Sequence, residues 1–268
     1  MQEADILTKE RLSLIEARLA EDGRVVAAKL ATELAVSVDT IRRDLRELAS
    51  EGRCRRVYGG ALPAAPRPGN HQQRLTYMIE RKQRLAEVAT SIIRAGMTIY
   101  VDAGTTNLAI VKALPADMPL TLITNAPAIA AFVLDRPACR LILLGGTVDL
   151  VTGAAVGAVA MRDAATLIPD VAIIGTCGFD IEAGLTAQTL DEAELKRLVC
   201  RQARLVAAAL TDDKLTTSAP YRVLSAQECQ YLILEATAPA ELVSSVRSLG
   251  VEVLLADAMP DTPEKNHD

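Results

Sequence analysis

The chain has few of the residues on which most catalytic and metal sites depend. Its two histidines, His71 and His267, stand in a proline-rich stretch and in the tail, which argues against histidine-based acid–base chemistry and against a histidine metal site. Five cysteines are scattered along 268 residues without a CxxC pair, so neither a zinc site nor a disulfide framework is indicated. We therefore predict free thiols, no catalytic residue, no cofactor and no metal.

Long apolar runs are also missing. No stretch approaches the roughly 18 uninterrupted apolar residues of a membrane span. The beginning of the chain, MQEADILTKER, has acids where a signal peptide needs a basic start and an apolar run. Half of the residues are nevertheless apolar, which is ample for a buried core and excludes disorder for most of the length. We expect a cytoplasmic protein with no membrane partner.

The formal net charge of -5 hides an uneven distribution. Residues 1–68 carry 12 Lys and Arg against 11 Asp and Glu, whereas residues 69–268 carry 17 against 23. The acidity therefore belongs to the larger C-terminal part, and the length favours two domains. A net-acidic protein can still bind nucleic acid through a local basic patch, and residues 52–58 hold three arginines with only Glu51 beside them.

The stretch from Ser37 to Gly60 has the pattern of a DNA-reading helix followed by a basic hairpin. An apolar seam of Ile41, Leu45 and Leu48 leaves a polar outer face, because residues three and four apart share a side of a helix. Ser37 is suited to cap this helix. The alternative is a solvated helix whose arginines pair with nearby acids, Asp44 among them. The candidate DNA contacts of the helix and its cap are Ser37, Asp39, Thr40, Arg42, Arg43 and Arg46.

Basic residues continue beyond this helix. Arginines alternate around Cys54 and are followed by Gly59-Gly60, a pattern typical of a short strand and a tight turn that carry cations towards phosphate. The candidate DNA contacts of this hairpin are Arg53, Arg55, Arg56 and Tyr58.

Two helical patterns precede the DNA-reading helix. Apolar residues recur at helical spacing from Thr8 to about Ala20 and from Val25 to Leu34, with Val26 on the apolar face of the second. Only two residues separate the second pattern from Ser37, which is typical of a helix-turn-helix. We predict a winged helix-turn-helix domain over residues 1–62. The proline-rich segment LPAAPRPGN cannot be helical, and we predict a linker over residues 63–73.

The rest of the chain alternates between strands and helices. A helix from about Met78 to Arg94, with Ile79 and Leu85 on its buried side, precedes seven apolar runs separated mostly by helical segments. These runs predict a mostly parallel sheet covered by helices on both faces. The α/β domain is expected over residues 74–256, followed by a disordered tail over 257–268. The runs lie at residues 98–101, 120–123, 141–144, 171–174, 205–210, 231–234 and 251–255.

Small or polar residues follow several of these strands. In open α/β sheets, ligands bind beyond the carboxyl ends of the strands. The loop DAGTTN at residues 102–107 offers hydroxyls and the amides of a helix start, which suit an anion. The alternatives are a capped turn without a ligand, a surface pair of Glu192 and Lys196, and a solvated Lys214. The candidate effector contacts are Asp102, Gly104, Thr105, Thr106, Asn107, Asn125, Gly145, Gly146, Gly175, Cys177, Gly178, Glu192, Lys196 and Lys214.

The stretch VSVDTIRRDLRELASEGRCRRVYGGA resembles the winged helix-turn-helix of the DeoR family of bacterial transcription regulators, in which TIRRDL precedes a basic wing ending in Gly-Gly-Ala. The rest resembles the family's sensor domain, which is similar in fold to ribose-5-phosphate isomerase. The resemblance covers about residues 7–256 and implies a multi-domain α+β chain. The family's motifs fall on residues 102–106 (D-x-GTT), 124–125 (TN), 145–146 (Gly-Gly), 184–186 (GLT, which adds Thr186 to the effector contacts), 192–193 (Glu-Ala), Lys196 and Lys214.

This resemblance implies a repressor of carbohydrate-metabolism genes that binds a double-stranded DNA operator. Its effector would be a phosphorylated sugar held by its phosphate at Gly104 to Thr106. Because one helix reads only a few base pairs, we expect a homo-oligomer, either a dimer or a tetramer. Three departures from the family's pattern predict altered polar contacts in the pocket: Thr211 for Asp, Leu215 for Phe, and Cys177 for Asp.

Two other functions stay open. A sugar-phosphate isomerase would need a carboxylate base, with Asp102, Asp180 and Glu192 as candidates, although the clustered acids after the fourth strand are missing. A thiol-based redox sensor would use Cys54 and Cys177, although a lone cysteine in a strand is usually inert.

Overall fold

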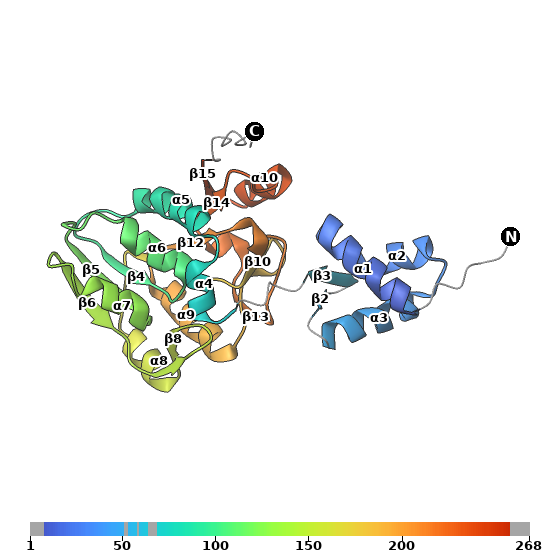
Figure 1. Cartoon of the computed structure of the whole chain (residues 1–268), viewed down its shortest axis with the longest axis horizontal. Helices are drawn as coiled ribbons and strands as arrows, with labels where there is room; N and C mark the ends of the chain where they lie inside the picture. The colour runs from blue at the N-terminus through green and yellow to red at the C-terminus, as the bar shows by residue number, and fades with distance from the viewer. Residues whose placement is uncertain (1–7, 51–52, 58, 64–68, 258–268) are drawn as a thin grey trace, which may run out of the picture. The chain divides into compact units, whose positions relative to one another are not determined.

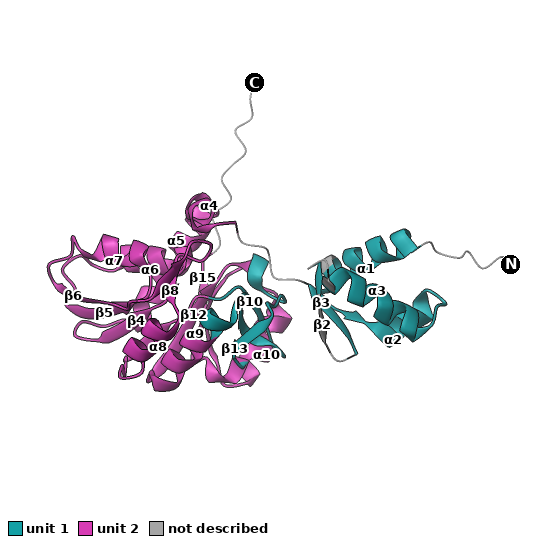
Figure 2. Cartoon of the chain, turned by 90° about the horizontal axis from the view of Figure 1, so that it is seen from below, with its two compact units in different colours: residues 1–68, 176–193, 213–225 teal, residues 69–175, 194–212, 226–268 magenta. Residues whose placement is uncertain are grey.

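The structure, a computed structural model, describes residues 8–50, 53–57, 59–63 and 69–257 (Figure 1). It divides into two compact units (Figure 2), of which the first comprises residues 1–68, 176–193 and 213–225 and the second comprises residues 69–175, 194–212 and 226–268. Tyr58, residues 64–68 of the predicted linker and all but one residue of the predicted disordered tail lie outside the described residues.

The N-terminal part of the first unit is a winged helix-turn-helix. A hairpin follows three helices, and a two-residue strand between the first two helices joins that hairpin in a sheet of order β1-β3-β2. The buried side chains of Ile15, Ile41 and Leu48 form the centre of its core. The elements are α1 (Thr8–Asp22), β1 (Val25–Val26), α2 (Ala27–Glu33), α3 (Val38–Ser50), β2 (Cys54–Val57) and β3 (Gly60–Pro63).

The second helix is shorter than predicted. Val25 and Val26 were expected to open it but form β1 instead, and Val26 is 49% exposed rather than on the buried face. The reason is tertiary, because Val26 pairs with Gly60 and the Ala27 amide donates to the Gly59 carbonyl at 2.8 Å. The hairpin thus supplies backbone partners that favour the extended geometry of two β-branched residues.

Helix α3 has the polarity that the sequence predicts. The Thr40 amide donates to Ser37 Oγ at 3.0 Å, which confirms the N-cap. Ile41, Leu45 and Leu48 are buried.

Asp44 departs from the solvated alternative, because it is only 2% exposed. Its carboxylate accepts two hydrogen bonds from Arg11 of α1, one of them from Nη2 at 3.0 Å. This fork-to-fork pair fixes α1 across α3.

The second unit is built on a sheet of seven parallel strands in the order β15-β14-β12-β9-β4-β5-β6. Each of the seven predicted apolar runs contributes one strand, which confirms the mostly parallel α/β fold. The strands are β4 (Thr98–Val101), β5 (Leu120–Thr124), β6 (Cys139–Leu143), β9 (Val171–Ile173), β12 (Leu205–Leu210), β14 (Tyr231–Glu235) and β15 (Glu252–Ala256).

Helices cover this sheet on both faces (Figure 2). Leu85 of α5, Ile110 of α6 and Ile129 of α7 belong to one buried cluster with the strands, and α8 lies on the opposite face. The helices are α4 (His71–Thr76), α5 (Ile79–Ala89), α6 (Thr105–Ala113), α7 (Pro127–Val133), α8 (Ala158–Ala164), α9 (Leu190–Gln202) and α10 (Ala240–Ser248).

The helix predicted from Met78 to Arg94 is interrupted at both ends. Met78 has a left-handed φ of 53° and separates α4 from α5, and a 3-10 turn at Thr90–Ile92 follows α5. Ile79 is 48% exposed, so its expected burial is wrong, whereas Leu85 is fully buried.

Helix α4 includes residues 71–73, which the sequence assigned to the linker. A capping box between Asn70 and Gln73 starts this helix. The buried ammonium of Lys82 holds its other end, because it donates to the carbonyls of Arg74 at 2.6 Å and Tyr77 at 2.5 Å. A lysine eight positions further along the chain thus satisfies carbonyls that the helix end leaves exposed.

Two smaller sheets complete the fold. A hairpin, β7 (Thr147–Asp149) with β8 (Ala154–Val156), belongs to the second unit. In the first unit, β10 (Gly178–Asp180), β11 (Gly184–Ala187) and β13 (Tyr221–Leu224) form an antiparallel sheet. No helix within the described residues is long and apolar enough to cross a bilayer.

Replacing Asp44 by alanine is expected to lower the free energy of unfolding of the winged helix by about 3–5 kcal/mol, because the buried Arg11 guanidinium loses its neutralising carboxylate. Asp39→Ala is the matched control, since Asp39 pairs with Arg42 at 3.2 Å on an exposed surface and should contribute less than about 1 kcal/mol. Hydrogen exchange of the α1 and α3 amides measures both values. Equal losses in the two variants would contradict the role given to Asp44.

Candidate DNA interface and effector site

The outer face of α3 is polar and exposed. Arg42 Nη1 donates to Asp39 Oδ1 at 3.2 Å, and Arg46 Nε donates to the Arg42 carbonyl at 3.3 Å. The side chain of Arg43 is exposed and has no hydrogen bond or ion pair among the described residues. Thr40, on the flank, is half-buried and shares a hydrogen bond with the Ser37 hydroxyl at 2.8 Å. The side chain with the fewest competing partners on this face is therefore Arg43.

The hairpin that follows α3 is the predicted wing. Its strands pair with Arg56 opposite Ala61 and Val57 opposite Gly60. Arg55 and Arg56 lie in β2, but their side chains are outside what the structure describes. Arg53 Nε donates to Glu16 Oε1 of α1 at 2.6 Å, so this arginine also ties the base of the wing to the helical core.

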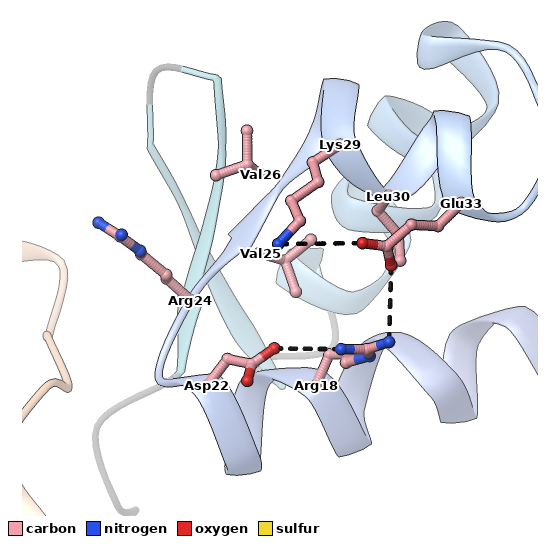
Figure 3. A pocket seen from close by; sticks show the side chains of 8 residues that line it. All are labelled: Arg18, Asp22, Arg24, Val25, Val26, Lys29, Leu30 and Glu33. Atoms are coloured by element: carbon pink, nitrogen blue, oxygen red, sulfur yellow. Dashed lines mark ion pairs between the residues drawn. The ribbon is translucent and has the colours of Figure 1, made fainter.

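A cavity of about 360 Å³ opens between α1, β1 and α2 of the winged helix (Figure 3). Four of its five charged side chains pair with one another, since Arg18 lies 3.5 Å from Asp22 and 3.6 Å from Glu33, and Lys29 lies 4.0 Å from Glu33. Arg24 takes part in none of the pairs drawn and extends away from them. The lining contains none of the residues predicted to bind DNA or effector, so we assign it no ligand.

In the second unit, three predicted effector residues form one buried network at the carboxyl ends of β4 and β9. Asp102 Oδ2 accepts the Gly175 amide at 2.9 Å and lies 3.2 Å from Lys196 Nζ, which donates to the Gly175 carbonyl at 2.7 Å. Asp102 is fully buried and Lys196 is 2% exposed. A Cβ on Gly175 would lie 2.6 Å from the Ala103 carbonyl oxygen, so only glycine fits.

Other polar residues of this edge also bind the protein's own backbone. Asn107 Nδ2 donates to the Asp102 carbonyl at 2.9 Å. Asn125 Oδ1 accepts the Ala103 amide at 3.1 Å, and its Nδ2 donates to the Ala155 carbonyl at 3.3 Å. Both asparagines are buried. These hydrogen bonds fix the path of the 102–107 loop.

The groups left accessible at this edge are mostly backbone. Gly104 is the N-cap of α6 with a φ of 155°, and Thr105 is half-buried. The amides of the first turn of α6 have no acceptor within the helix and favour an anion. Thr106 is buried, whereas Gly145 and Gly146 are exposed. A Cβ on Gly146 would lie 2.5 Å from the Val156 carbonyl oxygen, so this loop depends on glycine.

The remaining predicted effector residues belong to the first unit or to the start of α9. Thr186 is buried, with its hydroxyl donating to the Gly178 carbonyl at 2.9 Å. Lys214 Nζ donates to the Thr176 carbonyl at 2.9 Å and is half-buried, so it is not a solvated loop lysine. Glu192 is 6% exposed, which contradicts the alternative of an exposed helix pair with Lys196.

The cysteines are free thiols, as predicted. Burial raises the pKa of Cys229 to about 12 and also raises the pKa of Cys200. Cys54 is 5% exposed, with Sγ 3.6 Å from the Leu45 carbonyl, whereas Cys177 is half-buried. Reactive thiols need access and a stabilised thiolate, so the burial of Cys54 argues against redox sensing in the wing. No group of three metal-ligating side chains occurs within the described residues.

The ion pair between α5 and β14 was not evident from the sequence. Arg81 of α5 donates from Nε to Glu235 Oε1 at 2.6 Å, and Glu235 Oε2 accepts the Asp212 amide at 2.7 Å. Glu235 is 7% exposed and ends β14. Asp212 opens the 3-10 turn that ends at Lys214. The sequence offered one indication of this pair, namely the glutamate at the end of the apolar run YLILE. A carboxylate at such a buried position needs a partner.

Family models match both parts of the chain. The DeoR-like helix-turn-helix domain matches residues 11–66, and the DeoR C terminal sensor domain matches residues 78–236.

Similar curated proteins match along most of their length. The transcriptional regulator GlpR of Haloferax volcanii is 32% identical over 87% of this chain and 91% of its own. The Glycerol-3-phosphate regulon repressor of Escherichia coli is 28% identical over 83% and 89%. The transcriptional repressor GlcR of Bacillus subtilis is 29% identical over 93% and 96%.

The similar solved structures share little sequence identity with this chain. Ribose 5 phosphate isomerase A of Neisseria gonorrhoeae matches 53% of this chain and 56% of its own at 12% identity with a TM-score of 0.40. The Sorbitol Operon Regulator SorC of Klebsiella pneumoniae matches 77% and 90% at 15% identity with a TM-score of 0.34.

Lys196→Met is expected to lower the free energy of unfolding of the second unit by about 3–5 kcal/mol, because the buried Asp102 carboxylate loses its countercharge. The double variant Asp102→Asn with Lys196→Met should recover part of that loss, since neither ion then remains buried alone. Urea unfolding of the two single variants and the double variant gives the coupling. Strictly additive losses would contradict the network.

Proposed function

The chain belongs to the DeoR family of transcription regulators, and on that premise we propose that it represses carbohydrate-metabolism genes under the control of a phosphorylated sugar or related intermediate. It is a DNA-binding regulator and not an enzyme. One observation supports this proposal most strongly: the same chain has exposed arginines on α3 and, before α6, a loop that suits an anion.

The proposed DNA interface uses α3 and the wing in different ways. The exposed face of α3 enters the major groove, where Arg43 reads base edges with Thr40 and Arg42 beside it. The wing arginines bind phosphate and set the register. Arg53 has a partner in Glu16, which favours Arg55 and Arg56 for this contact. The rest of the proposed set is Ser37, Asp39, Arg46 and Tyr58.

The proposed effector site places a phosphate at Gly104–Thr106. The amides of the α6 start and the half-buried Thr105 hydroxyl suit a phosphate oxygen. The buried Asp102, Asn107 and Lys196 act by holding this loop, since Asp102 Oδ2, Asn107 Nδ2 and Lys196 Nζ already bond to the protein. Cys177 and Lys214 belong to the first unit and are half-buried, and their contact with the effector stays a prediction.

The name of one relative supports an effector of this class, because the Glycerol-3-phosphate regulon repressor joins repression to a small phosphorylated polyol. We propose that the present chain works in the cytoplasm. We also propose that it is a homo-oligomer, because a single recognition helix reads too few base pairs for a specific operator.

Arg43→Ala is expected to lose about 1–3 kcal/mol of discrimination between operator and unrelated DNA, because a base contact disappears. Arg55→Ala is the matched control and should weaken binding to all DNA about equally, with a shallower salt dependence, because it removes a phosphate contact. Anisotropy titrations of both variants at several salt concentrations separate the two effects. The reverse pattern would exchange the proposed roles.

The effector proposal is tested by a thermal-shift screen of phosphorylated sugars, since a ligand stabilises the fold in proportion to its occupancy. A hit should lose at least about tenfold in affinity in Thr105→Glu, because a carboxylate repels the phosphate while still suiting a helix start. Thr105→Gln is the uncharged control and should lose less. Equal affinities of wild type and Thr105→Glu for the hit would contradict a phosphate site at Gly104–Thr106.

A further inference from the structure

We propose that Arg81 and Glu235 couple the 3-10 turn at Asp212–Lys214 to the backbone between α4 and α5, so that what binds at Lys214 alters the first helices after the linker. We call this turn the 212–214 turn, residues Tyr77-Met78 the junction, and the contacts of Arg81 and Glu235 the Arg81–Glu235 link. The inference rests on the proposed function in that Lys214 is a candidate effector contact. Arg81 and Glu235 are positioning residues in this role, because neither belongs to the proposed contacts.

The 212–214 turn is fixed at its first residue by a buried carboxylate. Glu235 is the last residue of β14, and its Oε2 accepts the Asp212 amide at 2.7 Å. Because β14 and β12 are parallel neighbours, this hydrogen bond lies at the carboxyl edge of the sheet, where the 102–107 loop also lies. Thr237 Oγ1 donates to Asp212 Oδ2 at 2.5 Å. A hydrogen bond from an amide to a carboxylate is charge-assisted and stronger than one between neutral groups.

Arg81 holds this carboxylate in place. Its Nε donates to Glu235 Oε1 at 2.6 Å, and its Nη2 donates to Glu235 Oε2. Glu235 is 7% exposed, and a carboxylate buried to this extent stays ionised only when it is paired. The orientation of Glu235 therefore depends on Arg81, and the hydrogen bond to the Asp212 amide depends on that orientation.

The same guanidinium reaches the junction. Arg81 Nη1 donates to Met78 Sδ at 3.1 Å. Met78 has a φ of 53°, a left-handed conformation that residues other than glycine rarely adopt and that persists only where the surrounding structure enforces it. The ammonium of Lys82 donates to the Tyr77 carbonyl at 2.5 Å. Two neighbouring cations thus hold a strained stretch of backbone.

Arginine is suited to this link because its planar guanidinium carries donors in several directions. One side of the group binds the carboxylate that fixes the 212–214 turn, and another donor binds the residue that separates two helices. An ion pair that served stability alone would need only the first contact. A displacement of Asp212 therefore moves Glu235 and the guanidinium, and it changes the contact that restrains Met78. Coupling between distant sites travels through hydrogen-bond networks of this kind.

The junction lies close to the winged helix along the chain. Strand β3 ends at Pro63 and α4 starts at His71, so residues 64–70 alone separate them. A change in the direction of α4 relative to α5 shifts the point at which the second unit holds this connection. The 212–214 turn thereby acts on the chain that leads to the winged helix through the fold of the second unit.

The test is hydrogen exchange of single amides in the full chain, with one small change at each end of the Arg81–Glu235 link. Thr237→Val removes the hydroxyl that binds Asp212 and keeps the shape of the side chain. It is expected to speed the exchange of α4 amides such as that of Arg74, which donates to the Asn70 carbonyl at 3.1 Å, by about threefold or more. Met78→Leu removes the sulfur and keeps the volume. By reciprocity it should speed the exchange of the Asp212 amide by a similar factor.

Arg81→Lys separates transmission from stability. Lysine still neutralises Glu235, but its single ammonium lacks the second arm that reaches Met78. In the Arg81→Lys background, Thr237→Val should therefore leave the exchange of the α4 amides unchanged. The matched control is Arg204→Gln, which removes the ion pair of Arg204 with Asp170, 3.5 Å apart, next to the start of β12. This control should alter the exchange of neither α4 nor the Asp212 amide.

Three results would overturn the proposal. The first is unchanged exchange of the α4 amides in Thr237→Val. The second is an equal α4 response to Thr237→Val in the wild-type and Arg81→Lys backgrounds, which is what a merely structural ion pair gives. The third is a uniform loss of protection across the seven-stranded sheet in Thr237→Val, because that reports a general loss of stability and no specific coupling.

Inorganic phosphate separates this proposal from the proposed function. Added to the wild-type chain, it should protect the amides of residues 104–107, where the phosphate of the effector is proposed to bind. Protection there, with an α4 response that Arg81→Lys does not change, would contradict the Arg81–Glu235 link alone. Unaltered exchange at residues 104–107, with an α4 response that Arg81→Lys abolishes, would contradict the proposed effector site and support the link.

Discussion

The buried carboxylate of Asp102 is the constraint on which the edge of the second unit depends. An ion without solvent persists only when it is paired and hydrogen-bonded, and Asp102 meets that condition through Lys196 and the Gly175 amide. The ends of β4 and β9 and the helix α9 must therefore meet in one arrangement. The loop before α6 takes its shape from this requirement, with Gly104 at the helix start.

This constraint divides the polar residues of the edge into two groups. Asn107 and Asn125 bind backbone atoms of the loop and its neighbours. They would therefore assist ligand binding by holding the loop in shape. The groups that remain for an anion are the first amides of α6 and the Thr105 hydroxyl. Preorganisation of this kind lowers the ordering that binding must supply. In the proposed effector site, these groups would contact the phosphate.

In the winged helix, some arginines hold the fold together, and others are left for the proposed DNA contacts. Arg11 is buried against Asp44, and Arg53 is bound to Glu16, and both pairs orient the elements around α3. Arg43 stands on the exposed face with no partner among the described residues. Charged residues that look alike in the sequence therefore differ in role because burial makes pairing obligatory for some of them.

The sequence by itself determined the helix-turn-helix, all seven strands of the parallel sheet and the cap of α3, because these follow from local periodicity and from hydrogen bonds between near neighbours. Only the tertiary structure decided the pairing of Val26 with the wing, the break at Met78, and the burial of Lys196 beside Asp102. Each of these depends on a partner far away along the chain, and a spacing rule carries no information about such a partner. The sequence also did not predict that residues 176–193 and 213–225 belong to the same compact unit as the N-terminal part, because these segments lie far apart along the chain.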